Sequence, residues 1–226
     1  LKVLVLERRG VVGGAAVTEE FHPGFRNSVA SYTVSLLNPK VIADLELKRH
    51  GLRIVERKVS NFLPLPGDDY FMAAPGITQD QVARFSARDA ARLPEYEQRL
   101  ETIADVVRAL LLEQPPNLVE HGLVRGIEEA VRAAQLGGRL NKLDIIAKRD
   151  LLDLFTKSAG EWLDHWFESE PVKALFGFDS IVGNFASPYT PGSAYVLLHH
   201  VFGEVNGKKG LWGHAIGGMG AITQAM

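Results

Sequence analysis

The spacing of hydrophobic and polar positions changes twice along the chain and divides it into three stretches. Up to residue 77, short apolar runs alternate with turn residues, which is typical of mixed strands and helices. Between 78 and 185, apolar residues recur every three or four positions, as on the buried face of a helix. From 186 to 226 the short runs return. The pattern predicts a helical insertion, residues 78–185, within an α/β frame.

The first stretch opens on Val3–Leu6, four apolar residues followed by Glu7. Such a run is typical of a buried parallel strand with the carboxylate at its carboxyl end. A short extended hairpin is expected next, at 16–19 and 21–25. Asn38-Pro39 predicts the cap and first turn of a helix that ends at Gly51. Further strands are expected at 52–56, 61–65 and 70–73.

In the helical stretch, Ser86 followed by Asp89 resembles a capping box, and it leads into a long apolar repeat. Pro94 lies early in that repeat, so we expect a kink there or two separate helices. Pro115-Pro116 ends the repeat. Shorter helices are expected after it, at 118–135, 138–148, 150–155, 159–168 and 171–178.

The last stretch contains a second candidate strand-to-helix junction. A loop at 188–193 leads into a helix over 194–202, with Ser193 as its cap, and residues 206–210 form a turn. Residues 211–216 then predict a strand, and Gly217-Gly218-Met219-Gly220 opens the next helix. A strand, glycines and a helix in this order direct backbone N–H groups toward a ligand.

Composition narrows the class of protein. A net charge of −2 and a pI near 6.4 argue against nucleic-acid binding, and no apolar run reaches the roughly 18 residues of a membrane span. Cysteine is absent, which excludes a redox disulfide or a thiolate metal ligand in these residues and fits the cytoplasm or the mitochondrial matrix. Both ends resemble cuts, so we expect an internal piece of a longer protein.

The start of the chain suggests half of a nucleotide site. An acid at the end of a second strand accepts hydrogen bonds from an adenosine ribose, and Gly13-Gly14 would let backbone amides approach a pyrophosphate. A Gly-x-Gly-x-x-Gly loop normally precedes such an acid by about 20 residues. The alternative interpretation is a buried strand with a solvated acid and an ordinary turn. For Gly217–Gly220, the alternative is simple capping of a helix by glycine.

The segment from Glu7-Arg8-Arg9 through Gly13-Gly14 to Thr18 resembles the second-strand signature of the flavin-dependent amine oxidase and phytoene desaturase superfamily. The glycine-rich turn at 217–220 resembles a turn near the flavin in the same superfamily. Further matching stretches lie in order along the chain, and they indicate a branch with a pyridine nucleotide-disulfide oxidoreductase domain. They are residues 14–20, 44–52, 166–171 and 187–200.

The resemblance implies an FAD-binding, doubly wound, Rossmann-like domain with a largely helical inserted substrate domain. Residues 1–58 would be part of the FAD domain, and 59–226 the substrate domain with the glycine-rich junction at its end. Glu7 would bind the adenosine ribose, with Arg8 beside the adenine, and Gly13 and Gly14 would line the approach to the pyrophosphate. Gly217, Gly218 and Met219 would lie near the flavin. Desaturases often place an arginine directly after the glycine pair, where this chain has Ala15.

The side chains offer no clear catalytic or metal site. Adjacent residues on a helix point about 100° apart, so His199 and His200 cannot both face one cavity, and a structural role is preferred. His165 and Glu161 lie four residues apart, but no third metal ligand is evident, and no metal is expected. The catalytic residues stay unassigned.

We therefore expect part of an FAD-dependent oxidoreductase that transfers a hydride from a C–H bond of a small, apolar substrate to the flavin. This chain alone is expected to be inactive. One alternative is a catalytically silent scaffold that binds a protein partner through 78–185. Another is a nicotinamide dehydrogenase in which Glu7 selects NAD.

Overall fold

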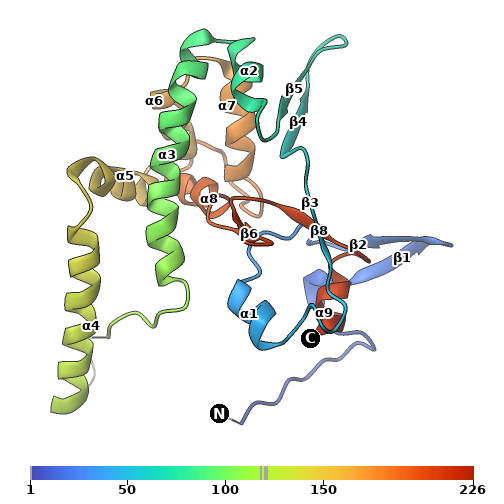
Figure 1. The fold of residues 1–226 in the computed structure, drawn as a ribbon, viewed down its shortest axis with the longest axis vertical. Helices are drawn as coiled ribbons and strands as arrows, with labels where there is room; N and C mark the ends of the chain where they lie inside the picture. Colours follow the sequence, from blue (N-terminus) through green and yellow to red (C-terminus); the bar gives the residue numbers. More distant parts are fainter. Residues whose placement is uncertain (1, 118, 120–121) are drawn as a thin grey trace. The chain divides into compact units, whose positions relative to one another are not determined.

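The computed structural model describes residues 2–117, 119 and 122–226 (Figure 1). The chain folds as two compact units. Unit 1 comprises residues up to 62, 72–75 and 203–226, and unit 2 comprises 63–71 and 76–202. The mixed helix and strand content confirms the α/β class at this coarse level. The functional domains expected at 1–58 and 59–226 stay predictions.

Unit 1 begins with the expected hairpin, in which β1 (Thr18–His22) pairs antiparallel with β2 (Phe25–Ser28). A single 3₁₀ turn, Gly14–Ala16, precedes it. The helix α1 (Pro39–Asp44) starts as predicted, because the Asn38 side chain accepts the N–H of Lys40 at 2.9 Å. The predicted start of this helix is confirmed, but its predicted end at Gly51 is wrong. The helix α1 ends at Asp44, because the N–H groups of Glu46 and Leu47 turn back to the carbonyls of Ala43 and Ile42.

The last residues of the chain fold back onto the first ones in unit 1. The strand β3 (Ile54–Glu56) pairs antiparallel with β8 (Gly213–Ala215), and α9 (Gly220–Ala225) follows β8. The short strands β6 (Glu204–Val205) and β7 (Lys208–Lys209) form another hairpin. Apolar side chains from both ends of the sequence share one core: Val34, Leu47, Leu52, Ala215, Met219, Ile222 and Ala225.

The expected strand at the start of the chain is not formed. Residues 2–6 have no regular structure, and the side chains of Val3–Leu6 are 78–84% exposed. A buried parallel strand requires neighbouring strands and covering layers, and within the described residues no strand pairs with this segment. The sheets of the described residues each contain two strands, so the expected doubly wound sheet stays a prediction.

The chain passes between the units within the pair formed by β4 (Asn61–Pro64) and β5 (Tyr70–Ala73). Both strands lie where the sequence predicts them. Unit 2 is otherwise helical, as expected. Its helices are α2 (Thr78–Ala83), α3 (Ala87–Leu110), α4 (Leu123–Asn141), α5 (Ile145–Thr156), α6 (Ala159–Trp166), α7 (Glu170–Gly177) and α8 (Ser193–His199).

The helix α3 runs without interruption through Pro94, so the expectation of two helices is wrong. A proline has no N–H to bond the carbonyl four residues earlier, which here belongs to Ala90. The side-chain amide of Gln79 donates to that carbonyl at 2.9 Å. A side chain therefore replaces the missing backbone bond, and the helix continues.

The start of α3 also differs in part from the expected capping box. The Ser86 hydroxyl accepts the N–H of Asp89 at 3.1 Å, as predicted. The Asp89 carboxylate, however, is completely buried and accepts N–H groups from Glu168 (3.0 and 3.2 Å) and Ser169 (2.9 Å). These two residues directly precede α7. One carboxylate thus ties the beginning of α3 to the beginning of α7.

Several predicted boundaries in unit 2 are corrected. The break expected between the helices at 138–148 and 150–155 is wrong, because α5 runs through residue 149. The helix α4 continues through Gly137-Gly138 to Asn141, because glycine costs only about 1 kcal/mol in a helix interior and does not forbid it. The break comes before Asp144, whose side chain accepts the N–H of Ala147 at 2.7 Å and caps α5. The predicted start at residue 118 lies outside the described residues.

The cap of α8 is also different from the expected one. Gly192 in the left-handed conformation precedes the helix, and Ser193 is its first residue. The Ser193 hydroxyl instead donates to the carbonyl of Pro188 at 2.8 Å and accepts the N–H of Ala159 at 2.9 Å. It therefore connects the 188–193 loop to the start of α6.

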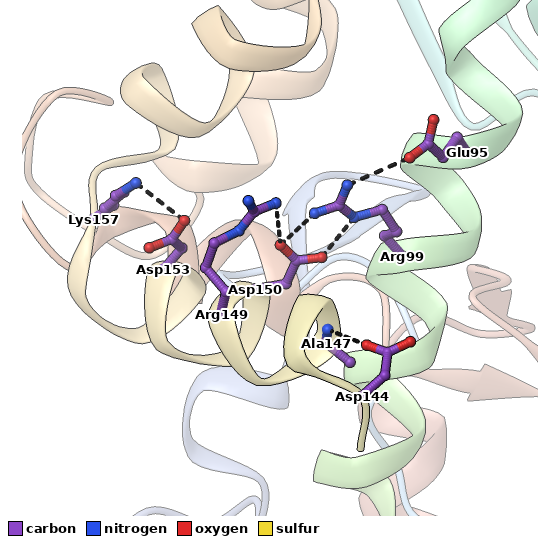
Figure 2. A network of polar contacts seen from close by, with 8 residues as sticks. All are labelled: Glu95, Arg99, Asp144, Ala147, Arg149, Asp150, Asp153 and Lys157. Carbon is purple, nitrogen blue, oxygen red and sulfur yellow. Dashed lines mark hydrogen bonds and ion pairs between the residues drawn. The ribbon is translucent and has the colours of Figure 1, made fainter.

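A buried ion pair joins α3 to α5 (Figure 2). Arg99 donates two hydrogen bonds to the Asp150 carboxylate, from Nε to Oδ2 at 2.6 Å and from Nη2 to Oδ1 at 2.5 Å. The Asp150 side chain is 2% exposed and that of Arg99 18%. The guanidinium also lies 4.8 Å from the ring centre of Trp166, which belongs to the aromatic core of unit 2.

We expect Asp150→Asn to lower the free energy of unfolding by about 3 kcal/mol, because it removes the buried anion of Arg99 and leaves only the exposed Glu95. Urea denaturation followed by circular dichroism measures this change. Glu95→Gln is the matched control: it removes the exposed partner of the same arginine and should cost no more than about 0.5 kcal/mol. Equal losses for the two variants would contradict a dominant role for the buried pair.

Candidate functional site

The two glycine-rich segments singled out in the sequence lie together in unit 1, although about 200 residues separate them along the chain. Gly13 and Gly14 begin the 3₁₀ turn before β1, and Gly217–Gly220 connects β8 to α9. Thr18 and Ser28 of the β1–β2 hairpin contact Gly218, and Thr18 also contacts Gly220. We call the two glycine-rich segments together the glycine-rich junction. The fold therefore assembles one glycine-rich site from the first and last parts of the chain.

Two hydroxyls of the hairpin hold the second segment in place. The Thr18 side chain accepts the N–H of Gly220 at 2.9 Å, and the Ser28 side chain accepts the N–H of Met219 at 3.1 Å. Figure 1 shows α9 close to this hairpin. These two N–H groups, which the sequence suggested would point toward a ligand, bond to the protein itself.

Close approach explains three of the glycines. A Cβ on Gly220 would lie 2.8 Å from the backbone nitrogen of Thr18, and one on Gly13 would lie 2.9 Å from Oγ1 of Thr223. A Cβ on Gly218 would collide with the Thr18 side chain. Contacts within the chain itself thus require glycine at these positions.

Gly14 is different, because a Cβ there would meet no heavy atom within 4 Å. Its φ of 53° still favours glycine. Gly217 has a φ of 90°, and it is exposed. Gly14 and Gly217 are therefore the points where the backbone of this junction is open to another molecule.

Glu7 and Arg8 do not lie in the assembled junction. Both are exposed, and the Glu7 carboxylate accepts the N–H of Arg9 at 2.8 Å. Arg9 forms an ion pair with Glu19 of β1. The roles expected for Glu7 and Arg8 at an adenosine stay predictions.

Met219 contributes to the site through its backbone only. Its side chain is 9% exposed and packs in the core of unit 1. The sequence did not assign roles to Thr18, Ser28 and Thr223, whose hydroxyls lie at the junction; the Thr223 hydroxyl also donates to the carbonyl of Gly220 at 3.1 Å. Thr18 occurs in the signature that suggested the superfamily, so a signal for it was present.

The histidine pair of α8 has the environment of structural residues. His200 is 8% exposed and its Nδ1 lies 2.7 Å from the carbonyl of Val196. Burial, together with the neighbouring His200, lowers the pKa of His199.

Among the described residues, no group of three or more histidine, aspartate or glutamate side chains could hold a metal ion. In the same part of the chain, no helix is long and apolar enough to cross a membrane.

The amino-acid sequence was compared with those of known proteins. No family model matches the chain. Two mammalian proteins named for an oxidoreductase domain resemble nearly all of it. These are the pyridine nucleotide-disulfide oxidoreductase domain-containing protein 2 of Rattus norvegicus and of Mus musculus, 39% and 38% identical over 236 residues and covering 98% of this chain.

The resemblance expected from the sequence is thus confirmed. An uncharacterized protein of Mycobacterium bovis is also similar, with 27% identity over 234 residues and 100% of this chain. The chain spans about 40% of the length of each of these relatives.

We expect Gly220→Ala to lower the free energy of unfolding by about 1–3 kcal/mol, because its Cβ would press on the Thr18 backbone, which cannot move aside freely. Gly126→Ala in α4 is the matched control, since its Cβ enters open space and should be neutral or stabilising. Denaturation curves of both variants test this. A neutral Gly220→Ala would show that the junction is not tightly packed.

Proposed function

We propose that the chain is part of an FAD-dependent oxidoreductase and that the glycine-rich junction of unit 1 lies at the cofactor. The observation that carries the proposal is the packing of Gly13 against Thr223 of α9, together with that of Gly218 and Gly220 against Thr18. The names of the two mammalian relatives support an oxidoreductase. The doubly wound FAD-binding sheet is part of the same proposal.

The residues of the glycine-rich junction have some of the features that an FAD site requires. Gly14 and Gly217 present backbone without a side chain to an incoming diphosphate or ring system. Unit 1 carries twelve lysines and arginines against seven acidic residues, which favours an anionic cofactor. Thr18 and Ser28 fix the 217–220 segment so that its open glycine keeps one conformation. Glu7 would complete the site at the adenosine ribose.

When bound, the flavin would accept a hydride from a C–H bond of the substrate. The chain would bind and orient the cofactor, and no side chain of this junction is required as a strong base. We propose a small, apolar substrate, and a location in the cytoplasm or, in a eukaryote, the mitochondrial matrix. The disulfide chemistry in the relatives' name is not proposed for these residues, because they contain no cysteine.

A scaffold that binds a protein partner is the second candidate. The observation in its favour is α4, which exposes Val124, Ile127 and Val131 at 72, 60 and 50%. A helix with such an apolar stripe commonly packs against another element. Flavin content distinguishes the two candidates, since the scaffold has no need of a cofactor.

The complete polypeptide that contains this sequence should purify with bound FAD, identified by its visible absorbance and by chromatography after heat release. Glu7→Ala in that polypeptide should weaken FAD binding by about 1–3 kcal/mol, the scale of lost charge-assisted hydrogen bonds. Glu128→Ala, an exposed glutamate of α4, is the matched control and should change nothing. A colourless protein, even after incubation with FAD, would refute the proposed function. Unchanged occupancy in Glu7→Ala would refute the role of Glu7 alone.

A further inference from the structure

Unit 1 contains a cavity of about 320 Å³ that is separate in its lining from the glycine-rich junction. Ligand pockets span about 300–1,000 Å³ and combine an apolar lining with a few polar groups. Here the apolar part comes from α1, β3 and the segment between them, mainly Ile42, Leu52 and Ile54. Four charged residues also line it: Glu46, Lys48, Arg49 and Glu204. The cavity therefore suits a small molecule with one apolar and one charged end.

The backbone at the cavity is unusual. Two non-glycine residues of the described chain have a positive φ, Glu46 (49°) and Asn206 (52°), and both line this cavity. Asn206-Gly207 forms the tight turn between β6 and β7, for which asparagine and glycine are the ordinary choice. Glutamate, in contrast, is not a residue type that favours a positive φ, so the conformation of Glu46 needs another explanation.

Glu46 occupies the position after a helix where glycine is usually found. Its N–H bonds to the carbonyl of Ala43 at 3.1 Å, and the N–H of Leu47 bonds to that of Ile42 at 3.0 Å. This is the Schellman ending of α1, whose left-handed residue is most often glycine. A glutamate there costs about 1–2 kcal/mol of backbone strain. Strained residues of this kind concentrate at functional sites.

The carboxylate placed by this strained backbone holds a cation at the cavity. Oε2 of Glu46 accepts from Nη1 of Arg49 at 2.8 Å, and Lys48 lies between them in the same turn. Lys48 and Arg49 are adjacent basic residues of the lining, and together they attract an anion. Glu204 would repel an anion near β6, so the anionic end belongs at Lys48 and Arg49.

We propose that this cavity binds a small amphipathic anion: an aliphatic chain against Ile42, Leu52 and Ile54, and a carboxylate at Lys48 and Arg49. Glu46 is a positioning residue that orients the Arg49 guanidinium. The proposal does not depend on the flavin, and its test involves none.

The first experiment compares three probes with the same chain and different heads, titrated calorimetrically into the 226-residue protein at low salt. Octanoate should bind about tenfold more tightly than octylammonium, with octanol between them, because only the carboxylate pairs with the two cations. Added salt should weaken octanoate and leave octanol unchanged.

Variants then locate the site. Lys48→Gln should weaken octanoate binding by about 3- to 10-fold, whereas Lys58→Gln, an exposed lysine outside the lining with the same loss of charge, should change it little. Ala43→Phe places bulk in the lining and should weaken octanoate and octanol alike. Circular dichroism verifies that each variant is folded.

Several results would overturn the proposal. These are octylammonium binding as tightly as octanoate, no binding of any probe, or equal losses in Lys48→Gln and Lys58→Gln. Unchanged binding in a folded Ala43→Phe would place the ligand elsewhere and would likewise overturn it.

Discussion

The antiparallel pairing of β3 with β8 is the constraint on which unit 1 depends. It joins residues 54–56 to residues 213–215, and the intervening chain contains all of unit 2. Once this pairing is made, α9 follows directly from β8 and its apolar residues enter the same core as Leu47 and Leu52. The glycine-rich junction and the hydroxyls that hold it are consequences of this closure, because they come from two stretches, 13–28 and 217–223, that are far apart in sequence.

The elements that the sequence predicted correctly are those with a local cause. Asn38 and Ser86 cap their helices as expected, because a cap needs only the neighbouring N–H groups. The segment Val3–Leu6 failed for the opposite reason: a parallel strand exists only beside other strands. Pro94 was misjudged because the group that compensates for it, the Gln79 amide, comes from another helix. Long-range partners of this kind leave no mark in the local pattern.

The candidate site shows the same division. The sequence identified the glycines at both ends, and the structure brings them together. It did not reveal why each is a glycine: three of them avoid the protein's own Thr18 and Thr223, whereas Gly14 and Gly217 are exposed. The functional meaning of a glycine depends on what its missing Cβ would touch. That contact is a property of the tertiary fold.

The buried carboxylate of Asp89 links the starts of two helices that lie about 80 residues apart in the sequence. Separating α3 from α7 would strip three hydrogen bonds from a carboxylate that water does not reach. Opening either helix end alone is therefore costly. The amides of both should exchange with solvent as one cooperative group, which makes this corner of unit 2 a single folding element built from distant sequence.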